Sequence, residues 1–164
     1  MTTWSSTASP RAPIVLDAIE AKCLPHVADA LGLDNDARAL RIRVLRKADG
    51  EPYAHSVIHI PRLLARHMPS DWQQRLATEP IVSLVANANA LPVHKAIQVA
   101  QAIAAPAAIA AKLEAPTGAP LLLLERTFFA RGGAALEHAQ VHCRPDRYRQ
   151  IIEFRSTRAT KEEA

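Results

Sequence analysis

Aromatic residues, cysteines and long apolar runs are scarce in this sequence of 164 residues. It contains three Phe, two Tyr, two Trp and two Cys. Two cysteines are too few for a disulfide framework, which favours a reducing compartment. No apolar run approaches the roughly 20 residues that a membrane-spanning helix needs, and the N-terminal segment before Ile14 lacks the apolar centre of a secretory signal. We therefore expect a cytoplasmic protein that makes no contact with a membrane.

The positive charge is modest and scattered along the chain. Lys and Arg outnumber Asp and Glu by 20 to 16, which gives a net charge of +4 and a pI near 9.4. A DNA-reading domain usually clusters its basic residues on one face and carries a recognition helix, and the sequence shows neither feature. The basic residues instead indicate a solvated surface. We expect that this chain does not bind DNA by itself.

The length predicts one folded domain, because domains commonly hold about 100 to 200 residues. We expect a disordered tail or linker remnant over residues 1–13, the domain over 14–156 and a charged tail over 157–164.

Hydrophobic spacing and turn residues indicate a mixture of strands and short helices. The pair Asp49-Gly50 is typical of a hairpin turn, and Pro69 and Pro80 break the segment that follows. The predicted elements are a helix over 21–31, two strands between 39 and 60, short helices between 61 and 91, a strand over 93–104, a helix over 106–112, strands over 121–129 and 135–143, and a final strand over 150–155. The Ala content of 93–104 also allows a helix, but we favour the strand because Val and Ile occupy alternate positions there. Hairpins without regular helical crossovers predict an α+β fold, an antiparallel sheet flanked by short helices.

Strand alternation places three polar residues on rows that are otherwise apolar. Arg46 ends an apolar row in the first predicted hairpin, and Ser56 lies on the apolar row of its second strand. Glu137 stands among small apolar side chains on the inward row of residues 135–143. Arg46 and Glu137 either form an internal ion pair or line a largely apolar pocket for a small molecule.

Histidines form two further pairs, on the rows opposite the apolar ones. His55 and His59 share one strand face, and His138 and His142 share another. Neither pair has the additional Cys, Asp or Glu spacing of a zinc site, so we expect solvated histidines, no metal and no cofactor. The sequence also lacks a nucleophile elbow, a phosphate-binding glycine loop and a CxxC motif, which argues against an enzyme.

Several blocks of sequence carry a family resemblance over roughly residues 15–155. They are ADALGL (Ala28–Leu33), RKADGEP (Arg46–Pro52), SLVANANALPV (Ser83–Val93), the segment 105–140 and RPDRYR (Arg144–Arg149). In this order they resemble the UTRA domain, the effector-binding module of GntR-type transcriptional regulators of the HutC group. The resemblance implies a chorismate lyase-like fold, a small and anionic effector, and a homodimer. It also implies that DNA is bound only through a winged helix-turn-helix, for which the residues before Val15 leave no room.

The resemblance also implies a set of ligand-binding positions. Family members that bind amino-sugar phosphates use an Arg-x-Arg pair, a Glu, a Ser with a Tyr, and a later Glu with a Tyr. Arg46, Ser83 and Glu137 match three of these positions. The other four depart: Val44 stands for the first Arg, Ser56 for the first Glu, Val85 for the first Tyr and Cys143 for the second Tyr. Losing one Arg and the Tyr hydroxyls removes much of a phosphate clamp, which argues against a sugar phosphate.

Three functions follow as hypotheses. The leading one is an effector-sensing and dimerisation domain without catalytic residues, in which the apolar strand 93–104 supplies surface for the homodimer. The second is a lyase-like enzyme on the same fold, with Arg46 holding a carboxylate and Glu137 acting as the acid that turns chorismate into 4-hydroxybenzoate and pyruvate. The third is a dimerisation module without a ligand, which would show a filled pocket.

Overall fold

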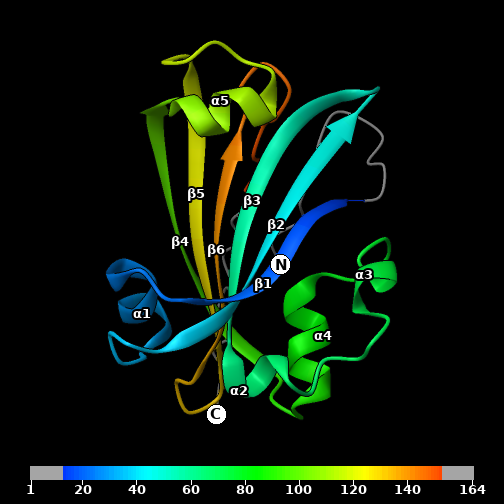
Figure 1. The fold of residues 1–164 in the computed structure, drawn as a ribbon, viewed down its shortest axis with the longest axis vertical. Helices are drawn as coiled ribbons and strands as arrows, with labels where there is room; N and C mark the ends of the chain where they lie inside the picture. The colour runs from blue at the N-terminus through cyan, green and yellow to red at the C-terminus, as the bar shows by residue number, and fades with distance from the viewer. Residues whose placement is uncertain (1–12, 153–164) are drawn as a thin grey trace, which may run out of the picture.

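The computed structural model describes residues 13–152 and shows a six-stranded antiparallel sheet with helices on both faces (Figure 1). The strand order is β1-β2-β3-β6-β5-β4, so β1 and β4 are the edges. The elements are β1 (Ile14–Lys22), α1 (Pro25–Leu31), β2 (Arg38–Ala48), β3 (Glu51–Pro61), α2 (Arg62–Ala65), α3 (Trp72–Arg75), α4 (Ile81–Ala88), β4 (Val93–Ala104), α5 (Ala107–Leu113), β5 (Pro120–Ala130) and β6 (Ala135–Cys143). The predicted α+β class, an antiparallel sheet with short helices, is confirmed.

Two tight turns form the hairpins that the sequence predicts. Asp49 and Gly50, with φ of 52° and 85°, join β2 to β3. Two adjacent positive φ values are what a type I′ hairpin turn requires. Gly132 and Gly133, both with φ of 92°, lie in the turn between β5 and β6. Since β6 also pairs with β3, the two hairpins join into one sheet.

Two predictions differ from the structure: the start of the first helix and the final strand. Ala21 and Lys22 belong to β1, an edge strand that the sequence analysis missed, and the first helix begins only at Pro25. Residues 150–152 form no strand, and the rest of the predicted strand 150–155 lies outside the described residues. The remaining helices and strands fall where they were predicted, within a few residues at their ends. No helix within residues 13–152 is long and apolar enough to cross a membrane.

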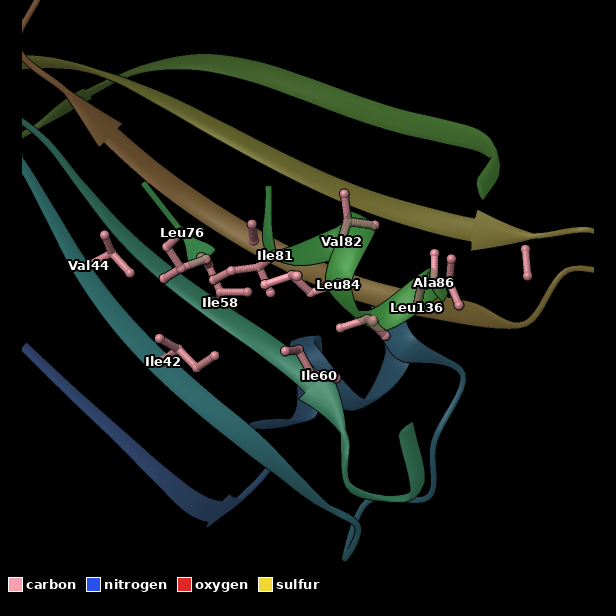
Figure 2. Close-up of a cluster of buried hydrophobic side chains, with 13 residues drawn as sticks. Ile42, Val44, Ile58, Ile60, Leu76, Ile81, Val82, Leu84, Ala86 and Leu136 are labelled. Atoms are coloured by element: carbon pink, nitrogen blue, oxygen red, sulfur yellow. The ribbon is translucent and has the colours of Figure 1, made fainter. Parts of the chain in front are cut away.

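One face of the sheet, called the inner face below, packs against α4 and bears Ile42, Ile58 and Ala139 (Figure 2). Helix α4 is apolar along most of its length, and its five buried residues are Ile81, Val82, Leu84, Val85 and Ala86. Burial of apolar area stabilises the fold by roughly 25 cal/mol per Å². The cluster under α4 therefore anchors this helix over the middle of the sheet.

The opposite face, called the histidine face below, bears His55, His59, His138 and His142, which the register aligns as two cross-strand pairs. Helices α1 and α5 pack over its two ends (Figure 1). The edge strand β4 remains uncovered, because all but two of its residues are exposed.

Candidate functional site

Glu137 occupies the inner face of β6 and is 5% exposed. Burial raises the pKa of this carboxyl to about 7, and the positive charge of Arg126 opposes that rise. Its Oε2 atom has no hydrogen-bond partner among the described residues. A buried carboxylate without a full set of donors is costly. The expectation that Glu137 points inward is confirmed, and its free oxygen marks a place where a ligand could donate a hydrogen bond.

Arg46 lies on the same face, at the other end of the sheet. Its register partner in β3 is Ala54, whose partner in β6 is Cys143. Burial raises the pKa of the Cys143 thiol to about 12, although the charge of Arg46 acts to lower it. The thiol therefore stays protonated at neutral pH and is a packed core group.

Arg46 and Glu137 do not form the ion pair considered from the sequence. Cys143, beside Arg46, and Glu137 are six residues apart in β6, which is about 20 Å along a strand. The ion pairs among residues 13–152 do not include either residue. The two charges therefore mark the two ends of the inner face, and one small molecule reaches both only if it is elongated.

The other predicted ligand-binding residues are mostly closed off between the sheet and α4. Val44 and Ser56 are register partners with exposures of 1% and 3%, and Val85 and Cys143 are fully buried. Ser83 is half-buried on α4. The structure thus gathers Val44, Ser56 and Val85 in or beside one apolar layer, and an effector must displace part of that layer or enter beside it.

Two open hollows among the described residues lie elsewhere. One, of about 360 Å³, opens on the histidine face beside the end of α1, between Gly32, Ile97 and Phe129. The other lies where β1 meets α1, near Lys22 and Asn35. Neither is lined by a predicted site residue. We place the candidate site on the inner face because the unpartnered buried carboxyl group lies there, whereas the hollows are shallow surface features.

Arg126 is a charged residue of the inner face that the sequence analysis missed. It lies in β5 opposite Ala139, next to the pair formed by Phe128 and Glu137. Its Nε donates to Oε1 of Gln98 in β4 at 2.8 Å, and its guanidinium lies 5.5 Å from the ring centroid of Phe128. The signal was available, since Arg126 interrupts an apolar row of its strand just as Arg46 does in β2.

Tyr148 brings the end of the RPDRYR segment to the same face. Its side chain packs beside Cys143 and Leu124, and burial raises its pKa to about 12. The segment is tied to β3, because the backbone N–H of Arg144 donates to the carbonyl of Tyr53 at 2.9 Å. Tyr148 thus supplies an aromatic side chain near the Arg46 end.

The expectation of solvated histidines is wrong. His55, His59 and His138 are 2%, 7% and 5% exposed, because α1 and α5 fold back over this face. Burial is the main reason that the pKa values of His55 and His59 fall to about 4, and it lowers those of His138 and His142 as well. Of these four, His138 forms a side-chain hydrogen bond, between its Nδ1 atom and the hydroxyl of Thr127 at 2.9 Å. The four histidines are therefore largely buried, and burial favours their uncharged form.

The inner face combines an apolar layer with a few charged and polar groups. Its residues offer one carboxyl group with a pKa near neutrality, two guanidinium groups and a thiol that stays protonated. Within residues 13–152, no group of three or more His, Cys, Asp or Glu side chains could hold a metal ion. Charge and hydrogen-bond donors at separated points of an apolar layer are typical of a site that recognises a small molecule.

The family model of the UTRA domain matches residues 14–149. The chain belongs to the UTRA-domain family. This UTRA domain is 32% identical over 123 residues to the HTH-type transcriptional repressor NagR of Bacillus subtilis, a match that covers 75% of this chain and 49% of NagR. The chain thus spans about half the length of that relative.

Solved structures agree with this assignment. A protein from Streptomyces coelicolor described as a transcriptional regulator matches with a TM-score of 0.78 and 31% identity, covering 91% of this chain and 97% of that one. The ligand-binding domain of a GntR-family regulator from Bordetella bronchiseptica matches with a TM-score of 0.79 and 18% identity, covering 94% and 98%. The second likeness supports the fold alone. The family model and the first match together support a ligand-sensing regulatory domain.

Proposed function

We propose that this UTRA domain binds a small effector on the inner face, between the sheet and α4, and that it does so as part of a GntR-type transcription regulator in the cytoplasm. The observation that carries the proposal is Glu137, a buried carboxyl group with one unpartnered oxygen next to the guanidinium of Arg126. The proposed contacts are Arg46, Ser83 and Glu137, with Val44, Ser56, Val85 and Cys143 as walls. An anionic group of an elongated effector would face Arg46.

Regulation then follows from differential binding. An effector that binds one arrangement of the regulator more tightly shifts the population toward it. DNA would be contacted by a winged helix-turn-helix outside this domain. No chemical step is required of the effector site.

The enzyme alternative has little support. Among the described residues of the inner face, Glu137 is a carboxyl group whose pKa burial raises to about 7, and the Cys143 thiol on the same row of β6 is held in its protonated form. Incubating the domain with chorismate and measuring 4-hydroxybenzoate tests this point. Turnover that is lost in Glu137→Gln would favour the lyase over the sensor.

A metabolite screen tests effector binding. Compounds that raise the melting temperature of the domain are taken to calorimetry with the parent protein, Arg46→Ala and Glu137→Gln. We expect Arg46→Ala to weaken binding of an anionic effector by about 1.5 to 3 kcal/mol, the range for a hydrogen bond to a charged group. Arg131→Ala, a change at an exposed turn residue, serves as the control. Unchanged affinity in both site variants, together with a large loss of stability, would contradict the proposed site.

We also propose that the domain is a homodimer through β4. This edge strand has twelve residues and exposes Val93, Ile97 and Val99 to 43%, 52% and 47%. A long apolar edge strand is prone to pair with another chain. Light scattering should give twice the mass of the 17.9 kDa chain, and Ile97→Asp should give the monomer mass. Leu63→Asp, at an exposed apolar residue of α2, is the matched control and should remain dimeric.

A further inference from the structure

Four side chains at one end of the inner face form a connected group: Glu137, Phe128, Arg126 and Gln98. Phe128 and Glu137 are register partners, and Arg126 is two residues from Phe128 on the same row of β5. Diagonal neighbours in a sheet lie within reach of long side chains. The Arg126 guanidinium lies 5.5 Å from the centroid of the Phe128 ring, and Phe128 is the register partner of Glu137. The group therefore spans three strands from β6 to the edge strand β4.

Gln98 holds Arg126 in this position. Its Oε1 accepts hydrogen bonds from both Nε and Nη2 of Arg126. Gln98 is one of only two residues of β4 that are not fully exposed, and its register partner is Arg126 itself. A guanidinium fixed by an amide oxygen and an aromatic ring loses much of its rotational freedom. Its charge is thus kept at a constant place relative to Glu137.

Within residues 13–152, Arg126 is the one charged group that shifts the pKa of Glu137. Helix α4, which packs over β6 on this face, has no ionisable side chain. On the same face, β3 contributes Ile58 and Ile60, both apolar. Helix α1 also packs against β6, and its ionisable residues are His26 and Asp29. The charge of His26 lowers the pKa values of His59 and His138, which lie on the opposite face. The charge of an ionised Tyr148 acts to raise the pKa of Arg126.

We propose that Arg126 is a positioning and specificity-determining residue of the effector site. Held by Gln98 and packed against Phe128, it keeps Glu137 able to ionise. The site therefore selects effectors that present a hydroxyl or an ammonium group to Glu137. This inference rests on the proposed function, because it takes Glu137 as an effector contact. An ionised carboxyl group accepts hydrogen bonds only, whereas a protonated one also donates. Without the charge of Arg126, Glu137 would stay protonated in its buried position and would donate a hydrogen bond to an anionic or carbonyl oxygen of an effector instead.

Titration of Glu137 tests the charge-setting part without any effector. The protein is labelled with ¹³C at the glutamate side-chain carboxyl groups, and the signal of Glu137 is assigned by its absence in Glu137→Gln. Removing the charge in Arg126→Met should raise the titration midpoint of Glu137 by about one pH unit or more, since a nearby opposite charge shifts a carboxyl by 1 to 3 units. Arg126→Lys keeps the charge and should restore most of the parental midpoint. Arg131→Gln removes an exposed charge and should leave it unchanged.

Folding defects do not hide the result. If Arg126→Met is unfolded at pH 8 but folds at pH 6, where Glu137 is protonated, the charge relation is supported. The proposal is overturned if Arg126→Met is unfolded at both pH values, or if it folds and the titration midpoint of Glu137 stays unchanged. Gln98→Leu should also abolish the slowly exchanging Nε–H signal of Arg126, and a retained signal would contradict the holding role of Gln98.

Ethanolamine and propionate serve as probes of selectivity. At neutral pH ethanolamine, and not propionate, should shift the Glu137 carboxyl signal in the parent, and this preference should be lost or reversed in Arg126→Met. A parental response to propionate alone, to both probes alike or to neither contradicts the selectivity. If the midpoint shifts as expected while neither the probes nor any screened metabolite bind, the charge relation stands and the proposed effector site fails, so the two failures are distinguishable.

Discussion

Lowering the pH from 7 to 5 is expected to weaken the fold through His55 and His59. Burial is the main cause that lowers their pKa values to about 4. The charges of His142, Arg43 and Lys112 add to this at His55, where Asp17 opposes them, and those of His138, Arg41 and His26 add to it at His59. In the unfolded chain both rings would titrate near 6.5. Between pH 6.5 and 4 the unfolded state therefore binds more protons, and stability falls as the pH falls.

The magnitude follows from the two pKa values. For a histidine that titrates near 6.5 unfolded and about 4 folded, the free energy of unfolding is about 2 kcal/mol lower at pH 5 than at pH 7. The two residues together account for about 4 kcal/mol. Glu137 acts in the opposite direction, because its pKa is raised to about 7 and its stabilising effect is lost as the pH rises; it contributes about 2 kcal/mol more at pH 5 than at pH 7.

Urea unfolding at pH 5, 6 and 7, followed by circular dichroism, measures the balance. His55, His59 and Glu137 together predict that the free energy of unfolding falls by about 2 kcal/mol between pH 7 and pH 5. His138 and His142 add to this loss, since burial lowers their pKa values too. His55→Leu and His59→Leu should each reduce the loss by about 2 kcal/mol, whereas Glu137→Gln should increase it by about the same amount. His94→Gln, in exposed β4, should change nothing. An unaltered loss in both histidine variants would refute this reasoning.

Three further predictions concern packing, a turn and the cysteines. Leu84→Ala should lower the free energy of unfolding by about 2 to 5 kcal/mol in urea titrations, because Leu84 is a buried residue of α4 that is only 1% exposed; a loss of less than about 1 kcal/mol would mean that α4 is loosely packed. Gly50→Ala should lower stability by about 1 to 2 kcal/mol and reduce the melting temperature, since φ is +85° there, and an unchanged melting temperature would contradict the strained turn. Cys23 and Cys143 are buried and burial raises both thiol pKa values, so mass spectrometry should find neither alkylated by iodoacetamide at pH 8 until the domain is unfolded; rapid labelling of the folded protein would contradict their burial.

The hairpins could be predicted from sequence because their signals are local. The tight turns need positive φ values, which Asp49-Gly50 and Gly132-Gly133 readily adopt. The alternation of residues on each side then predicts which side chains share a face of the sheet. The missed strand β1 lacks such a signal. It is a half-exposed edge strand in which Asp17 and Glu20 interrupt the apolar residues, and it ends where the helical spacing of α1 begins. Its pairing with β2, including the ion pair between Asp17 and Arg43, depends on a partner distant in the chain.

The candidate site could be predicted in part for the same reason. Alternation correctly placed Arg46 and Glu137 on the inner face, but it does not measure their separation along the sheet, which depends on the register of β2, β3 and β6. The histidines were assigned to the correct face and to the wrong environment. Whether a face of the sheet is exposed to solvent depends on helices such as α1 and α5, which pack against it only in the folded chain.

Consecutive residues of β6 explain why the two pH responses have opposite signs. Glu137 points to the inner face and His138 to the histidine face, and both are about 5% exposed. Burial disfavours the charged form of either group, so it raises the pKa of the acid and lowers that of the base. On acidification the inner face becomes more favourable and the histidine face less so, and a pH profile of the parent protein reports only their difference. Variants on the two faces separate these contributions to the pH dependence of stability. An effector that contacts Glu137 should change only the contribution of the inner face.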